Sequence, residues 1–416
     1  MDFTGNKLSD AFFQFISKNL EIETSRLRLS VNKNAYDFDV DLAITQIECR
    51  KKYKKKLKGF FNNPEFIVPS SLAGEQATHE AVALYHASLL NESDVCIDVT
   101  AGLGIDSMSM ANRVKNIISI EQDSLKASCL DYNKEKLGLT NLKVINEDSL
   151  SFLRSTDIKF NVVYADPARR DLSQKRVFGL EDSFPSVSEL MECLKNRPCR
   201  VLIKCSPMID ITQTLLQLGN IVAVYVISVD GECKEVLIDV DNMNNSQEEG
   251  NKEKNIIGKA VNLNPDGSIK HEFKTIIRGK KNDKTIEYIP ENYDYMEKYL
   301  YEPDASVMKF SPWNDLQADF PELLKMAASS HLFVSEHLYE KFPGRVLRIE
   351  KSIENKKDRN DLKNIPANIV SRNHPLTPDL FRKKMGIKEG FEKFIYLTTD
   401  NSGKHKILLT TLLINS

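Results

Sequence analysis

Residues 95–104 read VCIDVTAGLG, a short apolar run followed by a turn that contains Gly102 and Gly104. An apolar run that ends in a glycine-rich turn, with helix-forming residues after it, is typical of a buried strand, a tight turn and a helix. Glycines at such a turn allow the backbone to bend sharply and a ligand to approach closely. This stretch therefore predicts the first strand of an α/β domain with a binding site at its end.

The same alternation continues on the C-terminal side of this stretch. We expect strands over residues 95–99, 117–121, 142–146, 160–165 and 200–204, and helices over 105–113, 125–137, 149–154 and 186–195. Two further strands, 221–228 and 235–240, are joined by the hairpin-type turn Asp230-Gly231. Alternating strands and helices predict a parallel sheet covered on both faces, to which the hairpin adds one antiparallel strand.

The rest of the chain surrounds this α/β domain, which we expect over residues 91–240. Residues 1–90 read as mostly helical, including the segment 74–90, which is rich in helix formers. Residues 241–255 contain a single apolar residue, Met243, and predict an exposed linker or hairpin insertion. Short strand-like runs after the linker predict small α+β domains.

Composition excludes several classes of protein. The chain has 416 residues, of which 41% are hydrophobic and 28% charged, so it has enough apolar residues for globular cores. The longest apolar stretch, Ile221–Val229, is too short to cross a bilayer, and residues 1–20 lack a signal-peptide pattern. Seven cysteines without a C-x-x-C pair, and histidines without ligand spacing, predict reduced thiols in a cytoplasmic protein, with no metal site.

The net charge of −2 hides an uneven distribution. Residues 91–240 carry 17 Lys and Arg against 22 Asp and Glu, whereas residues 331–416 carry 16 against 10. This asymmetry suits a catalytic domain with a separate nucleic-acid-binding module, although chance variation between domains would look the same. Arg382-Lys383-Lys384 with Arg372 are candidate nucleic-acid contacts. The run RKKYKKKLK at 50–58 is either a second contact of this kind or a solvated helix face.

Two classes of cofactor compete for the glycine turn. A dinucleotide site requires a third glycine where this chain has Ser107, and Asp106 would place negative charge beside the diphosphate. S-adenosylmethionine has no phosphate, and its ammonium group can meet Asp98, directly or through water. Acids after the next two strands, Glu121 and Asp148, can accept hydrogen bonds from ribose hydroxyls and from the adenine amine, although Asp148-Ser149 is also an ordinary helix cap. The expected cofactor-binding residues are Asp98, Thr100, Ala101, Gly102, Gly104, Glu121, Gln122, Asp148 and Ser149.

The fourth expected strand ends in Asp166-Pro167-Ala168-Arg169-Arg170. Open α/β sheets bind ligands at the carboxyl ends of their strands, and a proline just past a strand breaks the pairing and restricts the backbone. Asp166 and the carbonyl groups beside it can hold an amino group with its lone pair aimed at a methyl donor. We therefore expect Asp166, Pro167 and Arg169 to form the catalytic motif, with orientation as its main contribution.

These motifs together resemble class I S-adenosylmethionine-dependent methyltransferases over residues 70–240. DPAR is similar to the D-P-P-Y motif of enzymes that methylate exocyclic base amines, but Arg169 stands where those enzymes stack an aromatic on the flipped base. Arginine can also stack on bases. AGLGID and Ser173-Gln174-Lys175 weakly resemble small-subunit rRNA guanine methyltransferases that carry AGLGRD and DPMFP.

A wider pattern resembles a bacterial methyltransferase family in which the catalytic domain precedes a ferredoxin-like and a THUMP-like domain. It includes GEQATHEAVALYHA, KCSPMIDI, GECKE, YLYEPDASVMK, FPGRV and NIVSRNHPL, from about residue 70 to 416. The resemblance implies a ferredoxin-like domain over 256–325, a THUMP-like domain over 326–416, and methylation of a base nitrogen in rRNA or tRNA. The alternatives are an RNA-binding protein with a silent methyltransferase fold, a methyltransferase acting on proteins or small molecules, and an NAD oxidoreductase.

Overall fold

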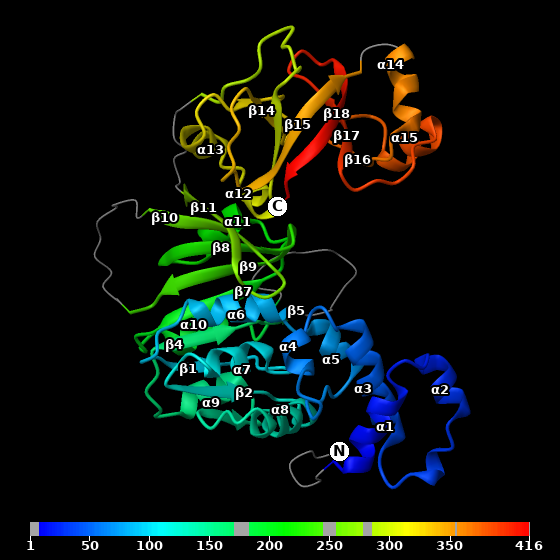
Figure 1. Cartoon of the computed structure of the whole chain (residues 1–416). Coiled ribbons are helices and arrows are strands. Elements are labelled where there is room, and N and C mark those ends of the chain that lie inside the picture. Colours follow the sequence, from blue (N-terminus) through cyan, green and yellow to red (C-terminus); the bar gives the residue numbers. More distant parts are fainter. Residues whose placement is uncertain (1–7, 170–182, 244–254, 278–284, 354–355, 416) are drawn as a thin grey trace. The chain divides into compact units, whose positions relative to one another are not determined.

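The computed structural model describes residues 8–169, 183–243, 255–277, 285–353 and 356–415 (Figure 1). The chain divides into two compact units. The first unit holds residues 1–229, 234–254 and 263–268, and the second holds residues 230–233, 255–262 and 269–416. Every residue of the expected catalytic and cofactor sites belongs to the first unit.

The N-terminal part of the first unit is helical, as expected. Its helices are α1 (Asp10–Asn19), α2 (Thr24–Ser30), the 3-10 helix η1 (Lys33–Ala35), α3 (Val40–Lys52), α4 (Lys58–Phe61), α5 (Ser71–Gln76) and α6 (Glu80–Ser88). Polar side chains cap them: Ser9 accepts a hydrogen bond from the N–H of Phe12, and Asp39 accepts one from Leu42. Helix α1 packs against α3 and buries apolar residues of both.

The expectation of helix over residues 74–90 is wrong in one respect: the chain leaves the helical conformation between the end of α5 and the start of α6. The hydroxyl group of Thr78 donates to the carboxylate of Asp106, and Nδ1 of His79 accepts from the N–H of Ala81 at 3.2 Å. Polar side chains that bind neighbouring groups compete with the helical ladder and act as caps. The interruption carries Thr78 to the candidate site.

A mixed sheet forms the centre of the first unit, with strand order β8-β9-β7-β4-β1-β2-β3. These strands are β1 (Val95–Asp98), β2 (Asn116–Ile120), β3 (Leu142–Ile145), β4 (Val162–Ala165), β7 (Arg200–Cys205), β8 (Ile221–Val229) and β9 (Glu232–Asp241). The neighbours from β3 to β7 pair in parallel, and β9 is antiparallel to β7. The expected parallel sheet with an antiparallel hairpin strand is confirmed.

The strand order of this sheet reverses direction beside β1, the kind of place where a ligand site is expected. The chain runs from β1 outward to β2 and β3 and then returns to the other side of β1 as β4. The helices of this domain are α7 (Ile105–Ala111), α8 (Ser124–Lys136), α9 (Ser149–Ser155), α10 (Val187–Leu194) and α11 (Ile211–Gln217). Open α/β sheets bind ligands where the strand order reverses, at the carboxyl ends of the strands. A short pair, β5 (Ala168–Arg169) and β6 (Ser183–Phe184), follows β4 and was not predicted.

The second unit is built on a seven-stranded sheet of order β13-β14-β12-β15-β18-β17-β16. These strands are β12 (Tyr299–Pro303), β13 (Leu324–Lys325), β14 (Phe333–Ser335), β15 (Gly344–Ser352), β16 (Asn368–Ser371), β17 (Lys393–Thr399) and β18 (His405–Ile414). Its helices are α12 (Ala305–Phe310), α13 (Trp313–Asp319), α14 (Lys356–Asp361), the 3-10 helix η2 (Leu362–Asn364) and α15 (Pro378–Met385). Strands β10 (Ile256–Leu263) and β11 (Ile269–Ile277) are neighbours in the chain and in their sheet.

A buried acid joins the two halves of the seven-stranded sheet. Glu302, only 4% exposed, accepts hydrogen bonds from Arg372 at 2.6 and 2.8 Å, from Arg345 at 3.2 Å and from the Tyr396 hydroxyl at 2.7 Å. Charged hydrogen bonds are worth about 1.5–3 kcal/mol each. Glu302 therefore ties β12 to β15, to β17 and to the residue that follows β16.

Candidate active site

The glycine turn after β1 has the geometry that the sequence predicted. Gly102 and Gly104 have φ angles of 57° and 83°, in the left-handed region that favours glycine. A Cβ on Gly104 would lie 2.1 Å from Cδ1 of Leu130, whereas a Cβ on Gly102 would meet only the Thr100 carbonyl oxygen, at 3.9 Å. Gly104 is therefore required by packing on α8. Gly102 borders open space, where a ligand can approach.

Asp98 supports this turn from below. It is 1% exposed, and its carboxylate accepts hydrogen bonds from the N–H of Thr100 at 3.0 Å and from the hydroxyl of Ser107. Ser107 in turn accepts from Ser119 at 2.7 Å. Burial raises the pKa of Asp98 to about 7. Its described bonds are all within the protein, and its contact with a cofactor ammonium stays a prediction.

Ser107 and Asp106 decide how the turn compares with a dinucleotide site. The Ser107 hydroxyl links Asp98 to β2, so its side chain has a bonding role where dinucleotide sites have glycine. Asp106 is 7% exposed and is bonded to His86 and Thr78. The expectation that Asp106 places negative charge beside a diphosphate is therefore wrong, because its charge is paired inside the domain. Ser107 is the residue that still disfavours a diphosphate at this turn.

Glu121 follows β2 and lies beside the turn. Its Oε2 accepts a hydrogen bond from the N–H of Gly102 at 2.8 Å, and its Oε1 accepts one from the N–H of Asp123, also at 2.8 Å. The side chain is half-buried, and Gln122 beside it is exposed. A carboxylate with two lone pairs on each oxygen can accept further bonds. Glu121 therefore braces the turn and keeps capacity for a ligand hydroxyl.

Asp148 follows β3 and caps α9. Its Oδ1 accepts from the N–H of Ser151 at 2.9 Å, and Ser149, the first residue of α9, is buried. The Asn146 side chain donates to the carbonyl oxygens of Glu121 and Gln122 at 2.7 and 3.0 Å. The helix-cap alternative for Asp148 is thus present in the structure. Its contact with adenine stays a prediction, and Asn146 is what joins the ends of β2 and β3.

Asp166 follows β4 and is bonded to the glycine turn. Its backbone N–H donates to Oγ1 of Thr100 at 2.6 Å, and its carboxylate is ion-paired with Lys204 of β7. The Asp166 side chain is 35% exposed and Pro167 is half-buried. Arg169 lies on β5, where its backbone pairs with Ser183. Residues 170–182, which include Arg170 and Ser173-Gln174-Lys175, lie outside the described residues.

A cluster of charged groups that the sequence did not predict lies beneath Asp166. At its centre, His86 is fully buried between two carboxylates. Its Nδ1 lies 2.8 Å from Asp106, and its Nε2 lies 2.6 Å from Glu235 of β9. These two acids overcome the burial of the ring and raise the pKa of His86 to about 10. Two motifs quoted for the family resemblance, KCSPMIDI and GECKE, contain Lys204 and Glu235 and were the signal in the sequence that could have indicated this cluster.

The basic run at 50–58 is largely occupied within the protein. Arg50 donates to the carbonyl oxygens of Phe61, Pro64 and Phe66 at 2.8–3.1 Å. Three lysines of the run are also bonded within the protein. Lys51 donates to the Ile22 carbonyl, Lys52 pairs with the Glu75 carboxylate, and Lys56 donates to the carbonyl oxygens of Gly74 and Glu75. These bonds pin the loop between α3 and α5. Lys54, Lys55 and Lys58 are exposed, and Lys51 and Lys52 are exposed as well despite their bonds.

The basic residues expected to contact RNA in the second unit also divide into two groups. Arg372 is paired with Glu302, and Arg382 donates to the carbonyl oxygens of Ile387 at 3.3 Å and Ala367 at 3.2 Å. Lys383 and Lys384 are exposed on α15. The first group therefore holds the fold together. The second group presents charge to solvent.

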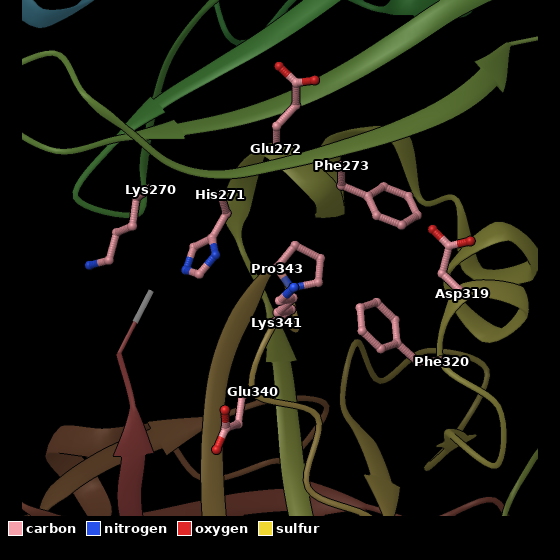
Figure 2. Close-up of a pocket in the computed structure, with 9 residues that line it drawn as sticks. All are labelled: Lys270, His271, Glu272, Phe273, Asp319, Phe320, Glu340, Lys341 and Pro343. Carbon is pink, nitrogen blue, oxygen red and sulfur yellow. The ribbon is translucent and has the colours of Figure 1, made fainter.

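A pocket of about 440 Å³ lies within the second unit (Figure 2). Its lining residues come from β11, the end of α13 and the segment before β15: Lys270, His271, Glu272, Phe273, Asp319, Phe320, Glu340, Lys341 and Pro343. Lysines and acids are mixed around it, so its charge favours neither sign of ligand. It shares no residue with the candidate active site. Among the described residues, no group of three or more His, Cys, Asp or Glu side chains is arranged to hold a metal ion.

Comparison with known proteins places the second unit and the fold as a whole. A ferredoxin-like domain model matches residues 299–343, and a THUMP domain-like model matches residues 344–411. The two models meet after residue 343, whereas the expected boundary between the ferredoxin-like and THUMP-like domains lies after residue 325. The expected domain bounds stay a prediction. A crystal structure described as a "putative methyltransferase from Porphyromonas gingivalis W83" is 25% identical, with a TM-score of 0.80, and covers 97% of this chain and 98% of its own.

Curated relatives match shorter stretches. An "uncharacterized RNA methyltransferase" of Mycoplasma mobile is 25% identical over 150 residues, which are 36% of this chain and 41% of that relative. "Ribosomal RNA small subunit methyltransferase J" of Francisella tularensis subsp. novicida is 33% identical over 81 residues, 17% of this chain and 33% of the relative. The chain thus spans well under half the length of these relatives.

Fold and comparisons together define the class of protein. The chain has the Rossmann-like sheet of class I methyltransferases, followed by ferredoxin-like and THUMP-like segments. The resemblance inferred from the sequence is confirmed, and the relatives of the chain include RNA methyltransferases. In the described part of the chain, no helix is both long enough and apolar enough for a transmembrane span.

Proposed function

We propose that this protein is an S-adenosylmethionine-dependent methyltransferase that methylates a base nitrogen in rRNA or tRNA. The observation that carries the proposal is the 2.6 Å hydrogen bond from the N–H of Asp166 to Oγ1 of Thr100. This bond holds the candidate acceptor motif against the candidate cofactor turn, at the carboxyl ends of adjacent strands β1 and β4. Methyl transfer needs donor and acceptor sites in that relation.

The cofactor would lie over the turn between β1 and α7. Gly102 borders open space, Glu121 can accept from ribose hydroxyls, and Gln122 is exposed beside it. Backbone groups from Thr100 to Gly104, with Asp148 and Ser149 after β3, would complete the site, and Asp98 would act from beneath. These residues fit a cofactor without phosphates, because no basic side chain belongs to the set. When bound, S-adenosylmethionine would supply a methyl group activated on a sulfonium.

The chain's own contribution to the reaction is mainly orientation. Asp166 would accept a hydrogen bond from the target amine, together with a carbonyl oxygen at Pro167, so that the nitrogen lone pair faces the methyl group. Asp166 would then receive the proton that the amine loses after transfer. Arg169 would stack on the base. If Arg169 stacks, Arg169→Lys retains charge but lacks the plane, and the KM for RNA rises or kcat falls.

RNA as the substrate is supported by the second unit and by the relatives. Residues 344–411 match a THUMP domain-like model, and both curated relatives described above are named as RNA methyltransferases. Residues 331–416 carry an excess of basic over acidic residues. Exposed lysines such as Lys383 and Lys384 would contact phosphates, which favours a polyanionic substrate over a protein or small molecule.

Mass spectrometry of nucleosides tests the function directly. Digested rRNA and tRNA from cells with and without this gene are compared, and purified protein is then added to RNA from the deletion strain. We expect one methylated nucleoside to be absent in the deletion strain and restored by the protein. Unchanged nucleosides, together with binding of S-adenosylhomocysteine, would instead support the silent RNA-binding protein or another substrate class.

A further inference from the structure

A closed ring of side-chain contacts lies beneath Asp166, and Lys204 links this ring to the Asp166 carboxylate. Lys204, whose side chain is 13% exposed, is ion-paired with Oδ2 of Asp166. Its Nζ also donates to Oγ1 of Thr78 at 3.0 Å and lies 3.9 Å from Oε2 of Glu235. The four side chains come from β7, the residue after β4, the interruption before α6, and β9. A lysine held from three sides has little freedom to leave its partner.

The ring closes through buried groups behind Lys204. Thr78 donates to Asp106, Asp106 contacts Nδ1 of His86 at 2.8 Å, and Nε2 of His86 contacts Glu235 at 2.6 Å. With His86 protonated, two cations face the three carboxylates of Asp106, Glu235 and Asp166. A buried group that is paired on every side is held in one arrangement, whereas an unpaired buried charge is costly.

We infer that Lys204 is a positioning residue for the acceptor step: it holds Oδ2 of Asp166 and leaves Oδ1 to accept from the target amine. This inference rests on the proposed function. The contact fixes the rotation of the carboxylate, so Oδ1 has one direction. It also supplies the positive charge that keeps Asp166 ionised, because burial and the neighbouring acids favour the neutral form.

The charges around the pair support this direction. Burial raises the pKa of Asp166, and Lys204 is the main group that opposes the rise, while Asp106 and Glu235 add to it. Among the residues that the structure describes, other titratable groups near this pair are Asp98, His86, Tyr164, Cys205 and Lys56. Loss of Lys204 would therefore raise the pKa of Asp166 further. An acceptor that must be ionised would then work only at higher pH.

The test combines a titration without substrate and a pH–rate profile. Protein labelled with ¹³C at aspartate carboxyl carbons is titrated by NMR, and the Asp166 signal is assigned by its loss in Asp166→Asn. Lys204→Met should raise the Asp166 midpoint by about one unit or more, as for the loss of an adjacent opposite charge. Lys204→Arg should leave the Asp166 midpoint near that of the wild type. Lys115→Met, at an exposed position in the same unit, is the matched control.

The rate measurement uses labelled S-adenosylmethionine and total RNA from the deletion strain. Lys204→Met should lower the single-turnover rate at pH 7 by about tenfold or more, with recovery toward pH 9, and Lys204→Arg should retain most of the rate. Binding of S-adenosylhomocysteine and thermal melting report whether each variant is folded. If Lys204→Met does not fold, Lys204→Gln, which keeps a hydrogen-bond donor but removes the positive charge, should shift the Asp166 midpoint in the same direction.

The outcomes separate the inference from the proposed function. An inactive Asp166→Asn, together with an unchanged Asp166 midpoint and pH profile in Lys204→Met, would overturn the role of Lys204 alone. An active Asp166→Asn would overturn the acceptor site itself. A lower rate in Lys204→Met with no change in the pH profile, and no recovery in Lys204→Arg, would mean that Lys204 only stabilises the fold.

Discussion

Oε2 of Glu121 accepts a 2.8 Å hydrogen bond from the backbone N–H of Gly102, across 19 residues of sequence. The bond ties the end of β2 to the turn after β1, so the acid proposed to bind ribose also shapes the loop proposed to hold the cofactor. The first prediction follows from this double role.

Glu121→Ala should weaken binding of S-adenosylhomocysteine by about 1.5–3 kcal/mol, the scale of one lost charged hydrogen bond. Calorimetry measures the change, and a thermal melt confirms the fold. Glu147→Ala, which removes an exposed acid after β3, is the matched control and should bind normally. Equal affinities for Glu121→Ala and the wild type would remove Glu121 from the site.

Asp166→Asn should slow the chemical step by about 10²–10⁴-fold and leave cofactor affinity nearly unchanged. Asparagine keeps the size and the backbone bond to Thr100 but loses the charge that attracts the amine. Single-turnover methylation of RNA measures the rate. A rate close to the wild type would mean that the target is held elsewhere and that DPAR is not the catalytic motif.

Gly104→Ala should destabilise the first unit more than Gly138→Ala. Both glycines have positive φ, 83° and 69°, so both variants bear a similar backbone cost of about 1–2 kcal/mol. Only the Cβ at position 104 meets a neighbour, Leu130, and overpacking adds about 1–3 kcal/mol. Denaturant unfolding of the two variants isolates the second contribution, and equal losses of stability would contradict it.

The stability of the first unit should fall as the pH rises from about 7 to 10, in part because of His86. Its pKa is raised to about 10 in the folded protein, above the unfolded value of about 6.5. A pKa that is raised by folding stabilises the protein fully at pH values below the unfolded-state pKa. This contribution is lost as the pH rises through the folded-state pKa. Thermal melts of the wild type and His86→Gln across this range should show a steeper decline for the wild type. Parallel declines would argue against a charged His86.

Exposed lysines on α15 should contribute to RNA affinity. Lys383→Ala/Lys384→Ala should weaken binding to total tRNA and reduce the salt dependence by up to about two phosphate contacts. Arg382 is left in place because it bonds carbonyl oxygens. Lys54→Ala/Lys55→Ala tests the basic run of the first unit in the same assay, with Lys115→Ala as the control. Unchanged salt slopes for the α15 variant would exclude this face.

Point variants test RNA binding more cleanly than a deletion of residues 331–416 would. Strand β12 pairs with both β14 and β15, which the deletion would remove. Glu302 would also lose Arg345, Arg372 and Tyr396 and would remain as a buried, unpaired acid. Such a loss destabilises the remainder strongly. A deletion would therefore report unfolding of residues 299–330 as well as loss of RNA contacts.

The sequence by itself determined the elements whose signals are local. The run 95–104 is a strand, a tight turn and a helix start because apolar spacing and glycine conformations act over a few residues. Glu121, Asp148 and Asp166 follow strands in register, so the sequence also predicted that they share one edge of the sheet. The N-terminal helices and the antiparallel hairpin strand followed from the same periodicities.

The tertiary structure decided which polar side chains meet. His86 and Glu235 are 149 residues apart, and Lys204 and Asp166 are 38 apart, so no local pattern reports their pairing. The same holds for Arg372 and Arg382, which a charge count assigns to RNA but which bind an acid and carbonyl oxygens. Secondary structure depends on neighbours in the chain. The charge state and direction of a buried side chain depend on groups that only the packing of distant segments brings together.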